Sequence, residues 1–415
     1  MKLTYVDLFA GIGGFRVGFD LFRKSHPEYE FECMQVSEIK KDAIATYNMN
    51  FGERIVPCGV ETLKNLPKFD ILCAGFPCQP FSSAGKKEGF ADKKRGNLIY
   101  EVLRICKESE PEFLILENVE HLTKMEKGRV LERILREFET LGYNVVWKLI
   151  NATEVGLAQE RTRLFILGSR SRNFTIKLNS YEPQYVRDII DKLDKKSHIL
   201  PSFLEKLSRF PAEYLIGKSV KDKRGGEQNI HSWDLDFHGT TNARQKELLN
   251  LLLRERRKKK WAALKNMKWM DGIPLSLTDI KTFYDYAELE EDVADLVAKK
   301  YLVKEHPKDL IDGKRVQNTS IEIGYNIAKG KLSFPISNIL HPDKTTPTLT
   351  ATDSSKLAVC FDNVVRQLND TELKRLCGFP ESFLIPEHVN QYDLFGNMVC
   401  PPIVCELLRC ILINV

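Results

Sequence analysis

The sequence predicts an α/β protein built on a doubly wound, mostly parallel sheet, with a second and smaller domain. Two observations lead to this prediction. Short apolar runs alternate with amphipathic helical stretches up to about residue 170, a pattern typical of βαβ units. From about residue 175 to residue 363 this alternation is lost, which indicates a separate lobe.

The first lobe contains six predicted strands, each rich in β-branched and aromatic residues. These strands are 3–9, 31–37, 69–75, 113–118, 145–151 and 164–169. Helices are predicted where apolar residues recur at helical spacing, at 13–24, 40–51, 97–108 and 129–142. In the second lobe, RERRKKKWAALK at 254–265 is expected to form one basic helix.

The composition is that of an ordinary globular protein, with 43% hydrophobic and 29% charged residues and a net charge of +5. No apolar run approaches the ~18 residues that span a bilayer, and Asp7 interrupts the first apolar segment. We therefore expect a cytoplasmic protein that does not bind a membrane. The ten cysteines show no C-x-x-C spacing with histidine partners, so no metal site is expected.

The densest charge lies at residues 254–260, where six basic residues accompany one acidic residue. This run has two interpretations of equal weight. It forms a solvated helix face, or it contacts a polyanion by neutralising phosphates.

Chemically active side chains follow the predicted strands where each strand ends. In a doubly wound sheet, ligands bind outside the carboxyl ends of the strands. The turn 9–14, Glu38, Cys78 and Glu117 all occupy such positions. Cys78 stands in a proline-stiffened loop, a setting suited to an exposed nucleophile, and a nearby carboxyl group could assist addition to an electron-poor ring. Glu38 is placed to accept the hydroxyls of a ribose.

Six ordered motifs in this chain resemble those of the DNA cytosine-C5 methyltransferase family, of the bacterial and phage restriction-modification type. They are DLFAGIGG (7–14), GFPCQPFSSAG (75–85), ENV (117–119), QERTR (159–163), RQLNDTELKRLCGFP (366–380) and FGNMV (395–399). The resemblance covers roughly residues 1–170 and 345–410. It implies a Rossmann-like, S-adenosylmethionine-dependent methyltransferase domain with a smaller target-recognition domain.

The resemblance implies a role for each catalytic residue. Cys78 would attack C6 of cytosine and form a covalent adduct, while Glu117 binds N4 and protonates N3. C5 then attacks the methyl group of S-adenosyl-L-methionine, and loss of the C5 proton releases Cys78. Arg163 would contact the cytosine carbonyl, and Arg161 would support the site beside Glu117. Because the attacked carbons lie inside the base stack, the cytosine must be flipped out.

The resemblance also implies a pocket for S-adenosyl-L-methionine. Phe9 would stack on the adenine, Glu38 would hold the ribose and Ile39 would pack on the adenine. The other implied cofactor-binding residues are Ala10, Gly11, Gly13, Gly14, Leu98 and Asn397. Because Asn397 lies near the C-terminus, the last helix must return to the first domain.

Contacts with double-stranded DNA are implied for Gln79 and Ser82, in a loop at about 80–97 that closes on the substrate. Thr348, in PTLTAT (347–352), would meet the backbone of the flipped nucleotide. A cognate restriction endonuclease acting on the same DNA site is an implied partner.

The expected domains are a catalytic and cofactor-binding domain at 1–175, a target-recognition domain at 176–363, a hinge segment at 364–388 and a returning C-terminal segment at 389–415. The residues of the middle region that contact bases are not readable from the sequence.

Two departures from the family pattern concern the cofactor pocket. The usual Gly-Asp after the third strand is Gly59-Val60-Glu61 here, so either Glu61 replaces the acid that reaches adenine or that hydrogen bond is absent. The usual Gly-Asn-Ser-Val is Gly-Asn-Met-Val, which changes the side chain at Met398 but keeps Asn397.

Three alternatives accompany the leading prediction of a sequence-specific DNA (cytosine-5-)-methyltransferase. The first is an RNA cytosine-C5 methyltransferase, against which the large middle region weighs. The second is a catalytically silent DNA-binding regulator, which would have lost the nucleophile or the acid, whereas Cys78, Glu117 and Arg163 are present. The third is a nucleotide-linked oxidoreductase, which gives Cys78 no role.

Overall fold

The computed structural model describes residues 1–77, 97–222, 228–269, 271–311, 313–328 and 334–413. The chain divides into two compact units. Unit 1 comprises Met1–Asp194, Pro342–Ser355 and Leu368–Val415, and unit 2 comprises Lys195–His341 and Lys356–Gln367. These units are defined by packing, so the functional boundaries expected at residues 175, 363 and 388 stay predictions.

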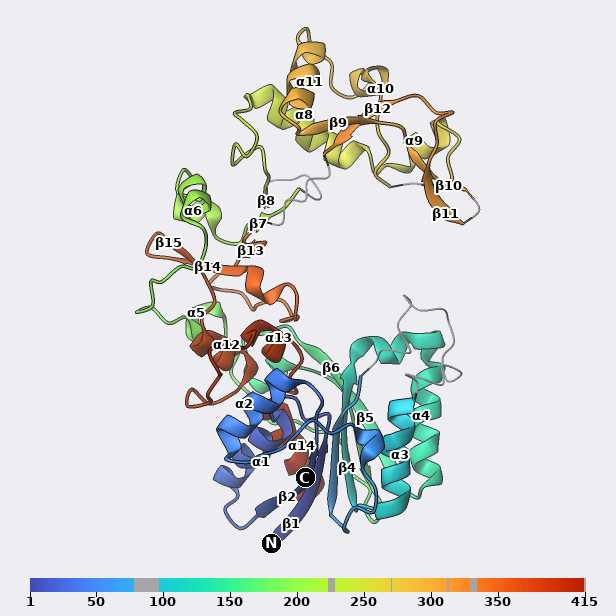
Figure 1. Ribbon diagram of the computed structural model, residues 1–415, viewed down its shortest axis with the longest axis vertical. Helices are drawn as coiled ribbons and strands as arrows, with labels where there is room; N and C mark the ends of the chain where they lie inside the picture. The colour runs from blue at the N-terminus through green and yellow to red at the C-terminus, as the bar shows by residue number, and fades with distance from the viewer. Residues whose placement is uncertain (78–96, 223–227, 270, 312, 329–333, 414–415) are drawn as a thin grey trace. The chain divides into compact units, whose positions relative to one another are not determined.

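Unit 1 is built on a six-stranded sheet in the order β2-β1-β3-β4-β6-β5 (Figure 1). Its strands are β1 Lys2–Leu8, β2 Glu30–Ser37, β3 Ile71–Gly75, β4 Phe113–Val119, β5 Asn144–Asn151 and β6 Thr162–Ser169. The strands β2, β1, β3 and β4 pair in parallel, and β6 runs antiparallel to both β4 and β5. The predicted mostly parallel α/β sheet is therefore confirmed.

The helices of unit 1 are α1 Gly14–Ser25, α2 Lys41–Phe51, α3 Asn97–Ser109, α4 Arg129–Thr140, α5 Val186–Ile189, α12 Asp370–Cys377, α13 Gln391–Gly396 and α14 Pro401–Leu412. In Figure 1, α1 and α14 lie on one face of the sheet and α3 and α4 on the other. On one face, Tyr5 of β1 stacks on Phe19 of α1, with ring centroids 4.3 Å apart. On the other face, α3 and α4 enclose the main core.

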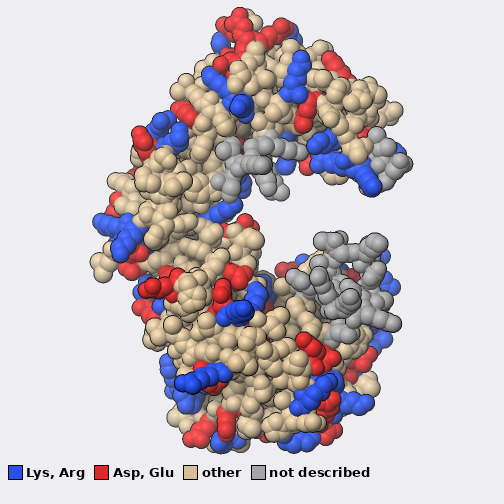
Figure 2. Space-filling view, in the orientation of Figure 1, with Lys and Arg blue, Asp and Glu red and all other residues tan. Residues whose placement is uncertain are grey.

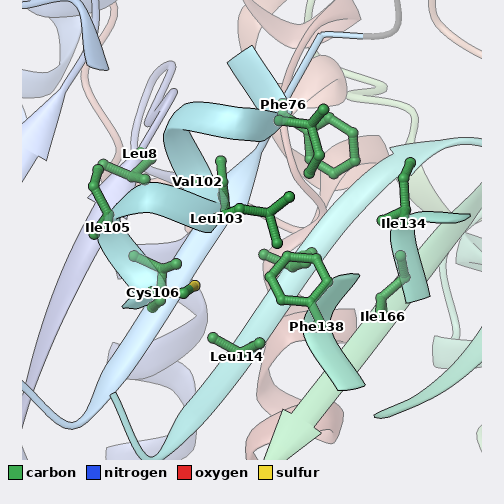
Figure 3. Packing of buried hydrophobic residues seen from close by; sticks show 14 of the residues in the cluster. Leu8, Phe76, Val102, Leu103, Ile105, Cys106, Leu114, Ile134, Phe138 and Ile166 are labelled. Carbon is green, nitrogen blue, oxygen red and sulfur yellow. The ribbon is translucent and has the colours of Figure 1, made fainter. Parts of the chain in front are cut away.

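The main core fills the space between α3, α4 and the middle strands (Figure 3). Alternate strand residues such as Leu114 and Ile166 point into it, as do Val102 of α3 and Phe138 of α4, and all four are fully buried. The period of two in the strands and the helical period in α3 and α4 bring these side chains to one face each. This packing fixes the strand ends that carry the candidate site.

The C-terminal helix α14 returns to unit 1 and packs against α1. A Cβ at Gly18 would lie 2.5 Å from Val404, so the two helices approach closely there. Residues Gln391–Leu412 are long and apolar enough to cross a membrane by length and composition alone, but most of this apolar stretch is buried inside the protein. The expectation that no stretch reaches bilayer length needs this correction, and the burial identifies a core segment.

Unit 2 combines short helices with small sheets. Its helices are α6 Pro201–Leu207, α7 Ala212–Leu215, α8 Ala243–Glu255, α9 Lys259–Leu264, α10 Leu277–Lys281 and α11 Leu289–Ala298. Its strands are β7 Ser219–Val220, β8 Asn229–Ile230, β9 Leu302–Glu305, β10 Lys308–Ile311, β11 Lys314–Gln317, β12 Gly324–Ile327, β13 Asn338–Ile339, β14 Leu357–Phe361 and β15 Val364–Gln367. They form a five-stranded sheet, β15-β14-β13-β7-β8, and two-stranded sheets β10-β11 and β12-β9.

The prediction of one continuous basic helix at 254–265 is wrong. Helix α8 ends at Glu255 and α9 begins at Lys259. Between them Arg256 turns inward, where it is 8% exposed and donates to Asn326 Oδ1 at 2.5 Å. The buried guanidinium needs this partner, and a continuous helix was expected only from local propensity.

Candidate active site

The turn after β1 has an unusual backbone. Phe9 has a φ of 58°, a left-handed conformation that is rare for an aromatic residue, and Gly11 and Gly13 have φ of 57° and 89°. A Cβ at Gly11 would meet nothing within 4 Å, so this side of the turn is open. A Cβ at Gly14 would lie 2.2 Å from the carbonyl oxygen of Val399, so glycine permits the C-terminal segment to reach the turn.

Glu38 follows β2 and lies beside this turn. Its Oε2 accepts from the Gly11 backbone N–H at 2.8 Å, and its Oε1 accepts from the N–H groups of Ile39 and Lys40 at 2.7 and 2.8 Å. Ala10 is buried next to this contact, and its N–H donates to the Ser37 carbonyl at 3.0 Å. The carboxylate is therefore held at the open side of the glycine turn with further acceptor capacity.

Ile39 is 67% exposed although it is a large apolar residue. Its position next to Glu38 and the open turn suits a planar ring. Leu98, in the first turn of α3, is partly buried against the main core. Glu61 lies in the 3-10 turn Val60–Thr62, and its Oε1 would be 2.3 Å from a Cβ at Gly59. The two alternatives for Glu61, replacement of the family's acid or absence of that hydrogen bond to adenine, stay predictions.

Asn397 lies at the end of α13, next to the segment that reaches Gly14. Its Nδ2 donates to the backbone carbonyl of Asp393 at 2.9 Å and to the Asp393 carboxylate at 3.0 Å. The C-terminal segment belongs to unit 1, and Val399, two residues after Asn397, reaches the turn at Gly14.

Glu117 and Arg163 form an ion pair at the carboxyl end of β4. Arg163 Nε lies 3.2 Å from Glu117 Oε1, and the two side chains are only 15% and 12% exposed. Arg163 is opposite Val119 in the register and Glu117 is opposite Phe165, so the two are diagonal neighbours on one face of the sheet. Burial raises the pKa of Glu117, against the opposing charges of Arg163 and Arg161.

The carboxylate of Glu117 faces the turn after β1 across the end of β3. Gly75 of β3 pairs with Glu117 in the register. A Cβ at Gly75 would lie 3.6 Å from Glu117 Oε2, 3.3 Å from Val399 and 4.0 Å from the Phe9 carbonyl oxygen. Strand ends that are far apart in the sequence therefore converge on one edge, as the strand order predicts.

Arg161 has a different environment from Arg163. It is 2% exposed, and its guanidinium donates to three backbone carbonyls. Nη1 donates to Leu349 at 3.1 Å and to Gly396 at 3.2 Å, and Nη2 donates to Gly396 at 3.3 Å and to Met398 at 2.8 Å. Burial and the charge of Arg163 lower the pKa of Arg161 to about 10, against the effect of Glu117. Arg161 thus ties the turn that carries Asn397 to the strand that carries Arg163.

Two residues within the quoted motifs have positioning contacts that sequence reasoning missed. Asn118 Nδ2 donates to the Phe76 carbonyl at 2.9 Å, which fixes the chain as it leaves β3. Gln159 is fully buried, and its side chain donates to the Leu376 carbonyl at 2.9 Å and accepts from the Leu349 N–H at 3.2 Å. The sequence offered a signal for both residues, because a polar side chain in a motif next to a buried strand needs a hydrogen-bond partner.

Thr348 precedes Leu349 and is half-buried in unit 1. Its hydroxyl donates to the Glu160 carbonyl. Two residues before it, Thr346 forms an isolated β-bridge with Gln159. The segment is therefore fastened to the start of β6. The predicted nucleophile Cys78, the predicted DNA-contacting residues Gln79 and Ser82, and the loop from 80 to 96 lie outside the described residues.

Comparison with known proteins agrees with this arrangement. Residues 3–412 match the family model described as C-5 cytosine-specific DNA methylase. The chain is 42% identical to the Type II methyltransferase M.NlaIV of Neisseria lactamica, with 97% of each chain covered. It is 37% identical to the Type II methyltransferase M.BanI of Aneurinibacillus aneurinilyticus, with 99% of this chain and 95% of that protein covered.

Solved structures share the fold over the full length. The methyltransferase EhMeth of Entamoeba histolytica has a TM-score of 0.54 at 13% identity and covers 100% of this chain and 99% of its own. A putative DNA modification methyltransferase encoded within an Escherichia coli prophage has a TM-score of 0.52 at 20% identity, with 100% of both chains covered. The family match over nearly the whole length shows that the chain belongs to the C-5 cytosine-specific DNA methylases and is a DNA cytosine-C5 methyltransferase that uses S-adenosyl-L-methionine.

Proposed function

We propose that Cys78 is the nucleophile of this methyltransferase and that Glu117 and Arg163 hold the target cytosine. The observation that carries the proposal is the buried Glu117–Arg163 pair, 3.2 Å apart, on the sheet edge that faces the glycine turn. Cys78 follows β3 by three residues, and β3 ends beside Glu117. This pair supplies an acid and a cation at one strand edge, and the place of Cys78 in the sequence, just after the neighbouring strand, supports its role as the nucleophile there.

The chemistry follows from the state of Glu117. Because burial raises its pKa, the carboxyl group holds a proton more readily and can donate it to N3 of cytosine. Protonation at N3 withdraws electrons from the ring, so the Cys78 thiolate adds to C6 and the electron pair of the C5–C6 bond becomes available at C5. Arg163 donates to the carbonyl oxygen of the base, where negative charge would otherwise develop.

The residues around the turn fit S-adenosyl-L-methionine. Gly11 leaves an open face, Glu38 presents a carboxylate to that face, and Ile39 exposes an apolar side chain beside it. We assign the ribose to Glu38 and the adenine to Phe9 and Ile39, with Asn397 closing the pocket. When bound, S-adenosyl-L-methionine would supply an electrophilic methyl group to C5, with S-adenosylhomocysteine as the leaving group. Loss of the C5 proton and departure of the Cys78 thiolate then restore the C5–C6 double bond, and N3 returns its proton to Glu117.

A duplex containing 5-fluorocytosine at the target site tests the assignment. In the presence of S-adenosyl-L-methionine, C5 receives the methyl group and then carries no proton to lose, because fluorine cannot leave as the proton does; the protein therefore remains attached to the DNA through Cys78 and migrates as a covalent complex on a denaturing gel. Cys78→Ala is expected to abolish this complex, and Glu117→Gln is expected to slow its formation. Cys73→Ala is the matched control, because Cys73 is fully buried in β3 and should leave trapping intact. A covalent complex formed by Cys78→Ala would remove the proposed nucleophile.

We further propose that unit 2 is the target-recognition domain and that the enzyme works in the cytoplasm as the modification partner of a cognate restriction endonuclease. Support comes from relatives at 42%, 41% and 37% identity that are named Type II methyltransferases. Bisulfite sequencing of plasmid DNA after incubation with the enzyme should show 5-methylcytosine within one short sequence. Methylation scattered over unrelated sequences would contradict this proposal.

A further inference from the structure

The basic run at 254–260, prominent in the sequence, is mostly engaged within unit 2. Arg256 is buried against Asn326. Arg257 Nε lies 3.3 Å from Asp271, and Lys258 and Lys260 both pair with Glu255, the latter at 3.4 Å. Most of these cations therefore already have partners, and this run is a weak candidate for a phosphate-binding surface.

A second basic element is not consumed in this way. Strands β10 and β11 form an isolated antiparallel ribbon, with Lys308 opposite Gln317 and Leu310 opposite Arg315. All four residues of β11 are exposed. A two-stranded ribbon has little stability of its own, so something else must hold it in place.

The anchor is Asp309 together with Trp269. The buried carboxylate of Asp309 accepts from the backbone N–H groups of Lys268 and Trp269 at 2.9 and 2.8 Å. The Trp269 indole donates to the Asp271 carbonyl at 2.6 Å, and the Arg315 guanidinium lies 4.3 Å from the Trp269 ring centroid. The guanidinium is thus held by a fixed aromatic platform, which lowers the entropy it loses on binding.

Four exposed cations gather on this element: Lys268, Lys308, Lys314 and Arg315. Within the described residues none of the four forms a salt bridge, and the one carboxylate on which any of them acts is that of Asp309, whose pKa is lowered in part by the charge of Lys268. Figure 2 shows Lys and Arg side chains concentrated over the position that β10 and β11 occupy in Figure 1. An unneutralised cluster of this kind attracts a polyanion.

We propose that the β10–β11 ribbon is a DNA-contacting element of unit 2, with Lys308 and Lys314 on phosphates and Arg315 directed to a base edge. This inference rests on the proposed role of unit 2. The major groove of B-form DNA, about 12 Å wide, admits a two-stranded ribbon. The deep and narrow major groove of A-form RNA does not, so the ribbon favours DNA over RNA. The fixed plane of Arg315 suits the paired acceptors of guanine.

The test measures the salt dependence of binding to a duplex with the methylated target sequence. Each phosphate contact contributes about 0.9 to the slope of log K against log salt. Lys308→Gln combined with Lys314→Gln should reduce the slope by about 2, so a fourfold rise in salt weakens this variant about twelvefold less than the wild type. The matched control is Lys195→Gln with Lys281→Gln, which removes the same charge from unit 2, where these lysines pair with Asp362 and Glu290.

The proposal holds if the ribbon variant changes the slope and the control does not. An unchanged slope in the ribbon variant, at an unchanged thermal midpoint of unfolding, would overturn it. So would an equal change in the control, or a change seen with an RNA duplex only. Wild-type methyl transfer is measured first on the same DNA, so failure of the proposed function appears in the wild type and failure of the ribbon appears only in the variants. Arg315→Lys should in addition reduce discrimination against a G-to-A change within the target by about tenfold or more.

Discussion

Replacement of Arg161 should destabilise unit 1 more than loss of any exposed arginine, because three buried carbonyls depend on it. Arg161→Ala leaves the carbonyls of Leu349, Gly396 and Met398 without their donors. At about 1–3 kcal/mol for each unsatisfied group, the upper bound is about 9 kcal/mol. The buried charge and its unpartnered Nε are unfavourable in the wild type and are removed with the side chain. We therefore expect a loss of about 3–5 kcal/mol.

Urea denaturation of the wild type and the variants measures this loss. Arg170→Ala is the matched control, since Arg170 directly follows β6 as Arg161 directly precedes it, and its Nη1 donates to one carbonyl, that of Leu141, at 2.9 Å. The control should lose about 1 kcal/mol. Arg161→Lys keeps the charge, but a single ammonium group cannot reach both carbonyl segments, so an intermediate loss of about 2 kcal/mol is expected.

A functional readout separates positioning from stability. The Gly396–Met398 turn carries Asn397, so Arg161→Lys should weaken S-adenosyl-L-methionine binding, measured by calorimetry without denaturant, by about tenfold. Arg170→Ala should leave this affinity unchanged. If Arg161→Ala lost no more stability than the control, the hydrogen bonds to the three carbonyls would not have the importance we assign to them.

Further predictions concern two buried carboxyl groups and two glycines. Burial raises the pKa of Glu117 above its ordinary value of 4.5, so the folded state binds more protons than the unfolded state. The stability of the wild type should therefore fall as pH rises from about 4.5 towards neutrality. Urea titrations at several pH values should show that Glu117→Gln lacks this fall. Asp7 is fully buried, neither of its carboxyl oxygens has a hydrogen-bond partner, and burial raises its pKa well above 3.8. Asp7→Asn should therefore gain stability relative to the wild type as pH rises. A difference in the free energy of unfolding between the two proteins that does not change with pH would contradict this. Gly14→Ala places a Cβ 2.2 Å from the Val399 carbonyl and should lower the free energy of unfolding, measured by urea denaturation, by about 1–3 kcal/mol. Gly11→Ala meets open space, so it should lower that free energy only by the strain of its positive φ, about 1–2 kcal/mol.

Local pattern predicted most of unit 1. The strand expected at 113–118 is observed at Phe113–Val119, and the helix expected at 97–108 at Asn97–Ser109. These elements bury one face each, so their hydrophobic period is visible in the sequence. Their order along the chain also placed Glu117 and Glu38 on one edge, because parallel strands end on the same side of the sheet.

The contacts of Arg161 could not be predicted in the same way. Its partners are backbone carbonyls 188 to 237 residues away, and a carbonyl leaves no trace in the identity of its residue. The resemblance gave Arg161 and Arg163 different roles and placed Arg161 beside Glu117, but only the fold shows that Arg163 pairs with Glu117 and that Arg161 holds the C-terminal turn. Unit 2 was beyond prediction for a related reason, since its short strands pair across distances that no local period records.

The two basic elements of unit 2 show why charge density in a sequence is a poor guide to a binding surface. The run at 254–260 has six basic residues, yet Glu255 alone pairs with two of them and a buried asparagine accepts from a third. The ribbon and the adjacent Lys268 have only four cations, spread over 48 residues from Lys268 to Arg315. They act together because Asp309 gives its carboxylate to backbone N–H groups, which orders the ribbon and leaves Lys308, Lys314 and Arg315 without a salt bridge among the described residues. A carboxylate that pairs with lysines removes a phosphate-binding surface, whereas one that pairs with the backbone can build it.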